Sequence, residues 1–144
     1  MKLTILGNNG PYPEQKGACS GYLLEKDDTH VLIDCGCGVL PRLVETTDIS
    51  RLNGIILSHL HFDHMSDVLV LQYYLQFHPT VSPIDLYAPE TPREVLSLIR
   101  SPSLRIRNIA SLERIGAIEF STIPVRHPIE AWAVSAQANG KRFV

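Results

Sequence analysis

The chain has 144 residues, of which 44% are hydrophobic and 19% are charged, and its formal net charge is −2 at pH 7. This length and composition are ordinary for one globular domain with its own core, and they exclude a chain that is disordered by composition. The slight negative charge gives no general attraction for phosphate backbones, so binding of RNA would need a local site. Three cysteines without disulfide spacing, no signal peptide and no long apolar run predict a reduced, cytoplasmic protein without a membrane span.

Short apolar runs alternate with turn-forming residues along the chain, and this alternation predicts an α/β fold with a mixed sheet and flanking helices. The expected strands cover residues 2–6, 20–26, 30–34, 54–58, 84–89, 104–109, 117–125, 131–137 and 142–144. The second and third strands form a predicted hairpin around residues 27–28, and Asn139-Gly140 is typical of a tight turn between the last two. The expected helices cover residues 38–47, 66–77 and 91–100. Ser66 and Asp67 suit the capping of the second helix.

The strongest chemical signal is ILSHLHFDHMSD at residues 56–67, where three histidines and two aspartates follow a buried strand. In extended backbone, side chains two positions apart share a side, so His59 and His61 are expected to bind one metal ion. Asp63 continues this alternation, whereas His64 is expected to begin the following helix. Asp63 and His64 can then serve a second ion nearby. Imidazole nitrogen with carboxylate oxygen suits zinc, manganese or iron, and the residues alone do not choose among them.

The segment SHLHFDH resembles the signature of the metallo-β-lactamase superfamily. LTILGNNGPYPEQKGACSGYLLE and VLIDCGCGV extend the resemblance to its ribonuclease Z-like branch, so that it covers essentially the whole chain. The resemblance implies an αββα sandwich, of which this chain supplies mainly the N-terminal half, as one C-terminally incomplete domain over residues 1–144. It also implies a metal-dependent hydrolase that uses a metal-bound hydroxide at a dinuclear site, with two zinc ions in the complete enzyme, or manganese or iron in their place.

By the same resemblance, His127 in TIPVRHP completes the first metal site with His59 and His61, and Asp63 and His64 hold the second metal. None of these ligands is assigned as the nucleophile, and no catalytic residue beyond them is assigned.

Two further residues have two readings each. Asp34 would orient a ligand histidine by hydrogen bonding, or it is a plain cap at the end of a strand. Arg126 could meet a substrate phosphate, or it faces solvent. CGC at residues 35–37 is expected to be structural, and the aromatic residues of QYYLQF (72–77) are expected to face the core.

The sequence also departs from the family pattern. Asp67 stands where many members have glycine, and the Asn139-Gly140 turn leaves no room there for the arm with which tRNA-processing members clamp tRNA. No aspartate follows Asp85 and no histidine follows His127, so the bridging aspartate and the last histidine that the family needs are absent. We therefore expect an N-terminal fragment of a longer enzyme, with a compact variant as the alternative. A homodimer or exchanged-strand assembly is expected to cover the sheet surface left open.

The resulting hypothesis is a phosphodiesterase of the ribonuclease Z-like group that acts on a phosphodiester or another small ester, with RNA possible but not supported by charge. A carboxylic ester or lactone hydrolase with the same site is the first alternative. The second is an inactive, metal-binding and self-associating fragment.

Overall fold

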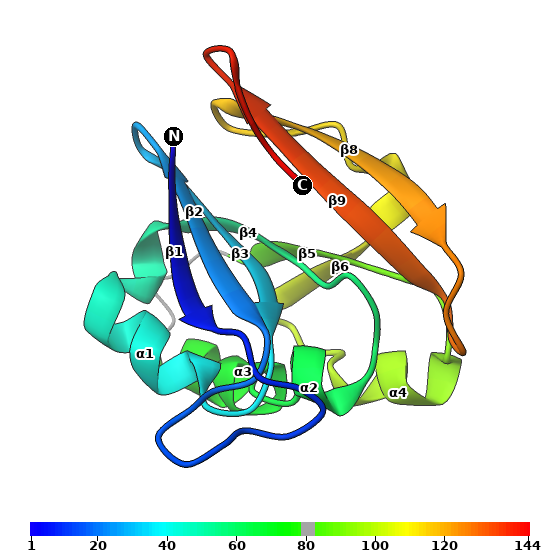
Figure 1. The fold of residues 1–144 in the computed structure, drawn as a ribbon. Coiled ribbons are helices and arrows are strands. Elements are labelled where there is room, and N and C mark those ends of the chain that lie inside the picture. Colours follow the sequence, from blue (N-terminus) through cyan, green and yellow to red (C-terminus); the bar gives the residue numbers. More distant parts are fainter. Residues whose placement is uncertain (79–82) are drawn as a thin grey trace.

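Two β-sheets pack face to face, and helices cover the outer face of the larger one (Figure 1). The computed structural model describes residues 1–78 and 83–144. The larger sheet has the strand order β1-β2-β3-β4-β5-β6, with bounds Lys2–Gly7, Gly21–Lys26, Thr29–Cys35, Leu52–Ile56, Ile84–Ala88 and Leu104–Asn108. The smaller sheet has the order β10-β9-β8-β7, and β7 to β10 cover Arg114–Ile115, Ile118–Val125, Ala131–Ala138 and Lys141–Phe143.

The direction of the strands explains where the helices lie. β1, β2 and β3 pair antiparallel, whereas β3, β4, β5 and β6 pair parallel. Parallel neighbours need crossover connections, and these connections contain the helices. The helices α1, α2, α3 and α4 cover Val39–Thr46, Phe62–Met65, Val68–Phe77 and Arg93–Leu98, and the short 3₁₀ turns η1 and η2 cover Ile49–Arg51 and Ile109–Ser111. The expected α/β class with a mixed sheet is confirmed.

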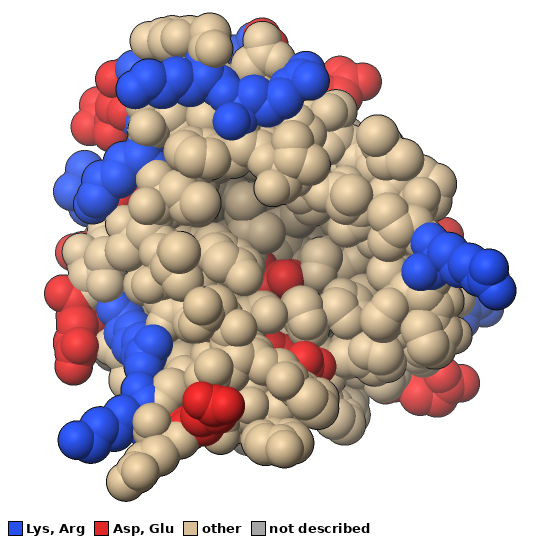
Figure 2. All heavy atoms as spheres, viewed as in Figure 1, with Lys and Arg blue, Asp and Glu red and all other residues tan. Residues whose placement is uncertain are grey.

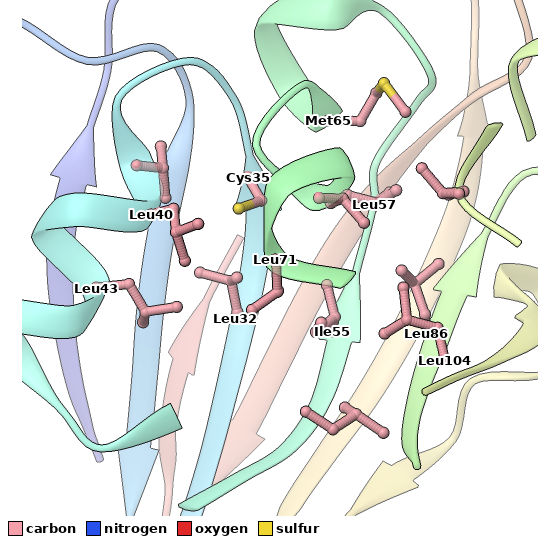
Figure 3. Close-up of a cluster of buried hydrophobic side chains, with 14 of the residues drawn as sticks. Leu32, Cys35, Leu40, Leu43, Ile55, Leu57, Met65, Leu71, Leu86 and Leu104 are labelled. Atoms are coloured by element: carbon pink, nitrogen blue, oxygen red, sulfur yellow. The ribbon is translucent and has the colours of Figure 1, made fainter. Parts of the chain in front are cut away.

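Alternation along the central strands builds two separate cores. Leu23 of β2 and Leu32 of β3 belong to the cluster under the helices (Figure 3), whereas Leu24 and Val31 belong to the cluster between the sheets. Successive side chains of a strand point to opposite faces, so one strand can supply both clusters. The continuous apolar character of the central strands follows from burial on both faces.

Helix α3 has an apolar face that the core does not cover. Val70, Tyr73 and Phe77 are 57%, 61% and 78% exposed. Their spacing of three and four residues places them on one side of the helix, opposite the buried Leu71 and Leu75. The expectation that the aromatics of QYYLQF face the core is therefore wrong for Tyr73 and Phe77. The helix is apolar around most of its circumference, so periodicity could not assign its faces.

Asp67 caps a different helix from the expected one. Its side chain makes no capping hydrogen bond at the start of α3. Instead, its Oδ2 accepts a hydrogen bond of 2.9 Å from the backbone N–H of Leu40, in the first turn of α1. The turn at Asn139-Gly140 is as expected, since both residues have positive φ angles of 48° and 72° between β9 and β10.

A cavity of about 330 Å³ lies between the two sheets. Its lining is mostly apolar and comes from β1–β3 on one side and from β9, β10 and the last residue on the other, with Ser58 at its wall. The surface is hollowed on the face seen in Figure 2. In the part of the chain that is described, no helix has the length and apolarity needed to span a membrane.

Candidate metal centre

The candidate centre lies where β4 ends and the hairpin loop between β8 and β9 meets it. β4 ends at Ile56, the chain bends at Ser58, and His61 directly before α2 has an extended backbone with φ and ψ angles of −72° and 147°. His59 forms an isolated antiparallel bridge with Ala131 at the start of β9, and the N–H of Trp132 donates to the carbonyl of Ser58 over 3.0 Å. These contacts bring the β8–β9 loop, which carries His127, onto the end of the larger sheet.

Three imidazoles gather at this point. One nitrogen from each of His59, His61 and His127 lies within 4.8 Å of the other two. The Nε2 atom of His127 is 3.1 Å from the Nδ1 atom of His61. The three side chains thus offer neighbouring nitrogen donors from two segments 66 residues apart in the chain. Such a donor set suits a divalent ion such as zinc.

Asp34 and Ser58 form a hydrogen-bonded base beneath the histidines. The Asp34 carboxylate accepts hydrogen bonds from the backbone N–H of Ser58 (2.8 Å), from its hydroxyl (2.9 Å) and from Nδ1 of His64 (2.8 Å). Asp34 is 4% exposed and has a φ angle of +56°. Aspartate and asparagine tolerate this left-handed conformation better than most residues.

These hydrogen bonds determine which ring nitrogens carry protons. A carboxylate only accepts, so both the Ser58 hydroxyl and Nδ1 of His64 donate to Asp34. The Ser58 oxygen is also 3.0 Å from Nδ1 of His59 and accepts from it. Both histidines therefore have their proton on Nδ1, and each keeps Nε2 as the atom available to a metal.

His64 and Asp63 lie beside the three-histidine cluster. The ring centroids of His59 and His64 are 4.0 Å apart, and Nε2 of His64 is 3.5 Å from Oδ2 of Asp63. Nitrogen and carboxylate oxygen donors thus adjoin the cluster on one side. Asp63 does not continue the extended alternation, and that expectation is wrong: it lies in the first turn of α2 with His64. The helix nevertheless keeps the two side chains adjacent.

His59, which is buried, and His64, which is half-buried, have pKa values shifted in opposite directions. Burial, with the neighbouring charges of His64, His127 and His61, lowers the pKa of His59 to about 4, against the opposing effect of Asp34. His59 is therefore neutral at pH 7, as a metal ligand must be. Burial also acts to lower the pKa of His64, but the Asp34 hydrogen bond and the charges of Asp34 and Asp63 outweigh it and raise that pKa above 6.5.

The remaining sequence candidates are surface or structural residues. Arg126 is exposed, and its possible contact with a phosphate stays a prediction. Cys35 is buried and Cys37 is exposed, and the structural role expected for CGC stays a prediction. Ser58 was not singled out by the sequence, although its position directly before the first histidine of the motif was a usable signal.

Comparison with known proteins decides the family. The family model of the metallo-beta-lactamase superfamily matches residues 15–134. The chain belongs to the metallo-beta-lactamase superfamily. Among curated members, it is 40% identical over 76 residues to the probable metallo-hydrolase YhfI of Bacillus subtilis. The matched segment is 53% of this chain and 31% of the relative. It is 30% identical over 100 residues to ribonuclease Z of Mycolicibacterium gilvum, and this segment is 67% of this chain and 35% of the relative.

Solved structures of this superfamily have the same fold. The crystal structure of Bacillus subtilis YhfI matches with a TM-score of 0.88 at 24% identity, over 97% of this chain and 60% of that one. Human tRNase Z, short form, matches with a TM-score of 0.77 at 20% identity, over 99% of this chain and 67% of that one.

This metallo-beta-lactamase chain spans about a third of the length of the curated relatives that it matches. The ribonuclease Z-like resemblance noted in the sequence is confirmed by the named relatives, which are a probable metallo-hydrolase and a ribonuclease Z.

Proposed function

We propose that this protein is a metal-dependent phosphodiesterase of the ribonuclease Z-like group, with a dinuclear centre. His59, His61 and His127 would hold one divalent ion, and Asp63 and His64 would hold the second. Zinc is the proposed metal, with manganese or iron as the alternatives. The observation that carries the proposal is the convergence of three imidazole nitrogens within 4.8 Å of one another.

The donor atoms fit a divalent ion in three respects. His59 is neutral at pH 7 because its pKa is about 4, so it needs no proton release before binding. The Asp34–Ser58 pair directs Nε2 of His59 and of His64 away from the backbone. Nitrogens of His61 and His127 are 3.1 Å apart, close to the separation of about 3.3 Å that two bonds of 2.0–2.1 Å give at a tetrahedral zinc.

When bound, two such ions supply an activated water as nucleophile and polarise the attacked ester. The side chains of the protein prepare this centre. Asp34 keeps the proton of His64 on Nδ1, and Ser58 does the same for His59. The buried environment of Asp34 and His59 strengthens these contacts because little water competes for them.

Phosphodiesters are the proposed substrate class because of the named relatives. The curated relatives include ribonuclease Z, and human tRNase Z is among the solved structures of the same fold. RNA is a possible substrate, although the net charge of −2 does not favour it.

The test is hydrolysis of bis(4-nitrophenyl) phosphate against 4-nitrophenyl acetate, after chelation and then addition of zinc, manganese or iron. Metal-dependent turnover of the phosphodiester, lost in His59→Ala, supports the proposal. Preference for the acetate or for a lactone supports the alternative ester hydrolase on the same site. Metal binding without turnover of either compound contradicts catalysis by this chain and leaves a metal-binding, self-associating fragment.

Residues 1–144 are proposed to form one domain, and two copies are proposed to associate. The uncovered side chains of Val70, Tyr73 and Phe77 on α3 support self-association, because soluble monomers seldom expose adjoining large apolar residues. The α3 helix contains no charged residue, so it does not discriminate against a second identical helix. The apolar cavity between the sheets offers a second surface for association.

A further inference from the structure

Glu130 holds an unusual number of hydrogen bonds for a partly exposed carboxylate. Its Oε2 accepts from the backbone N–H groups of Glu90 and Thr91 over 3.1 and 3.0 Å, and from the Thr91 hydroxyl over 2.9 Å. Its Oε1 accepts from the indole N–H of Trp132 over 3.0 Å. Burial acts to raise the pKa of Glu130, but the hydrogen bonds outweigh it and hold that pKa below its usual value. The side chain is therefore a carboxylate at neutral pH.

These hydrogen bonds join two segments that are distant in the chain. Glu90 and Thr91 follow β5 of the larger sheet, whereas Glu130 directly precedes β9 of the smaller sheet and Trp132 is its second residue. β8 and β9 pair antiparallel up to Val125 and Ala131, so the residues between them form a hairpin loop. Glu130 thus ties one end of this loop to the larger sheet.

His127 lies in that loop, three residues before Glu130. On its other side, β8 ends at Val125 with exposed residues, and Arg126 is exposed as well. Ile129 adds an apolar contact with the core under the helices. The position of His127 relative to His61 therefore depends on anchors that follow it in the chain. Backbone contacts of Ala131 and Trp132 with the motif segment are one of them, and Glu130 provides the side-chain hydrogen bonds.

We propose that Glu130 is a positioning residue for the metal centre: it holds the β8–β9 loop against the loop after β5 so that His127 meets His61. The inference rests on the proposed function, because it gives His127 the role of a metal ligand. The carboxylate is suited to the task because all four partners are donors. An amide in its place turns an N–H₂ group toward at least one of them and loses that hydrogen bond.

The decisive measurement is made on the metal-free chain by NMR. The ring centroids of His61 and His127 are 4.9 Å apart, as are those of His59 and His61, so both pairs give nuclear Overhauser effects in the wild type. In Glu130→Ala the effect between His61 and His127 is expected to disappear, whereas that between His59 and His61 remains. Because His59 and His61 share one segment, their contact can survive a general loosening of the fold, so the amide spectrum of Glu130→Ala must also match that of the wild type outside the β8–β9 loop.

Cobalt binding provides the second readout, through visible absorption during titration with Co²⁺. Glu130→Ala is expected to weaken cobalt binding about tenfold or more, and Glu130→Gln less. Trp132→Phe, which removes one donor and keeps an aromatic ring, serves if Glu130→Ala fails to fold. The control is Glu119→Gln on β8, which removes a surface ion pair with Arg114.

The inference would be overturned if Glu130→Ala keeps the nuclear Overhauser effect between His61 and His127 and binds cobalt as tightly as the Glu119→Gln control. If the wild type binds no cobalt, but Glu130→Ala loses the nuclear Overhauser effect between His61 and His127, the proposed function is refuted and the positioning role of Glu130 stands. Loss of both imidazole contacts together would also count against the inference, since it indicates general unfolding.

Discussion

Asp34 and His64 are joined by a hydrogen bond of 2.8 Å between Oδ2 and Nδ1, across 30 positions of the chain. The bond links the end of β3 to α2, and the same carboxylate receives both donors of Ser58. The protonation of the His64 imidazole in α2 therefore depends on the carboxylate of Asp34 at the end of β3. His64 has a raised pKa for this reason, against the effect of its burial.

Asp34→Asn is expected to lower the pKa of His64 in the metal-free protein. The substitution keeps a side chain that tolerates the left-handed backbone, and it removes the negative charge that stabilises the protonated imidazole. The measurement is an NMR titration of His64 in the presence of a chelator, with Asp85→Asn at the surface as the control. An unchanged pKa of His64 in Asp34→Asn would disprove this account.

The same pair has a consequence for stability as a function of pH. A group whose pKa is raised by folding stabilises the folded state below its unfolded pKa of about 6.5, and this contribution is lost as pH rises through the folded pKa. The difference in unfolding free energy between wild type and Asp34→Asn is therefore expected to shrink as pH rises past that point. Denaturant unfolding of the metal-free proteins at pH 6 and pH 9 measures it, and a difference that grows with pH would contradict the assignment.

His127→Ala is expected to reduce metal binding at least tenfold, because the substitution removes one of the three converging nitrogens. Metal content per chain by elemental mass spectrometry, on protein whose intact mass has been verified, gives the stoichiometry. His78→Ala is the matched control, since Nδ1 of His78 is bonded to the carbonyl of Tyr74 at the end of α3. Equal metal content in wild type and His127→Ala would exclude His127 as a ligand.

The sequence predicted the elements of the fold well because their signals are local. Alternation in β2 and β3 and the Asn139-Gly140 turn depend on neighbouring residues, and the structure has them as expected. The spacing of His59 and His61 likewise predicted that they lie together, as their centroid distance of 4.9 Å confirms. The meeting of His127 with His61 needed the family resemblance, because no local pattern relates residues 66 positions apart.

The missed features depend on partners far away in the chain. Ser58 and Glu130 are ordinary polar residues in the sequence, and only the tertiary structure shows which groups they bind. Asp67 satisfied a local rule for capping α3, yet its carboxylate accepts a hydrogen bond from the backbone N–H of Leu40 in α1 instead. Competition between a local and a distant partner is decided by packing, which a sequence pattern does not contain.

Asp67→Ala is expected to lower the free energy of unfolding by about 1 kcal/mol, the usual cost of removing a capping hydrogen bond. The loss arises at the N-terminus of α1, where the Leu40 N–H would be left without its acceptor. Thermal and denaturant unfolding measure the change. Ser66→Ala is the adjacent control, because the buried Ser66 hydroxyl has no hydrogen-bond partner among the described residues and should cost nothing. Equal losses in the two variants would argue against the cap.

Self-association is expected to depend on the exposed side of α3. Phe77 is 78% exposed and Tyr73 61% exposed, so contact between two copies would remove large apolar surfaces from water. Light scattering coupled to size-exclusion chromatography at micromolar concentration is expected to give a dimer for the wild type. Phe77→Glu is expected to give a monomer, because a dimer would bury the new charge without a partner.

Ile123→Glu provides the control for that experiment. Ile123 lies on β8 and is 64% exposed, so the substitution adds the same charge to a surface of similar exposure away from α3. It should leave the dimer intact. A folded wild-type monomer at micromolar concentration contradicts self-association altogether. A dimer that Phe77→Glu does not dissociate excludes α3 as the contact, and association then has to use another surface, of which the apolar opening between the two sheets is the first to test.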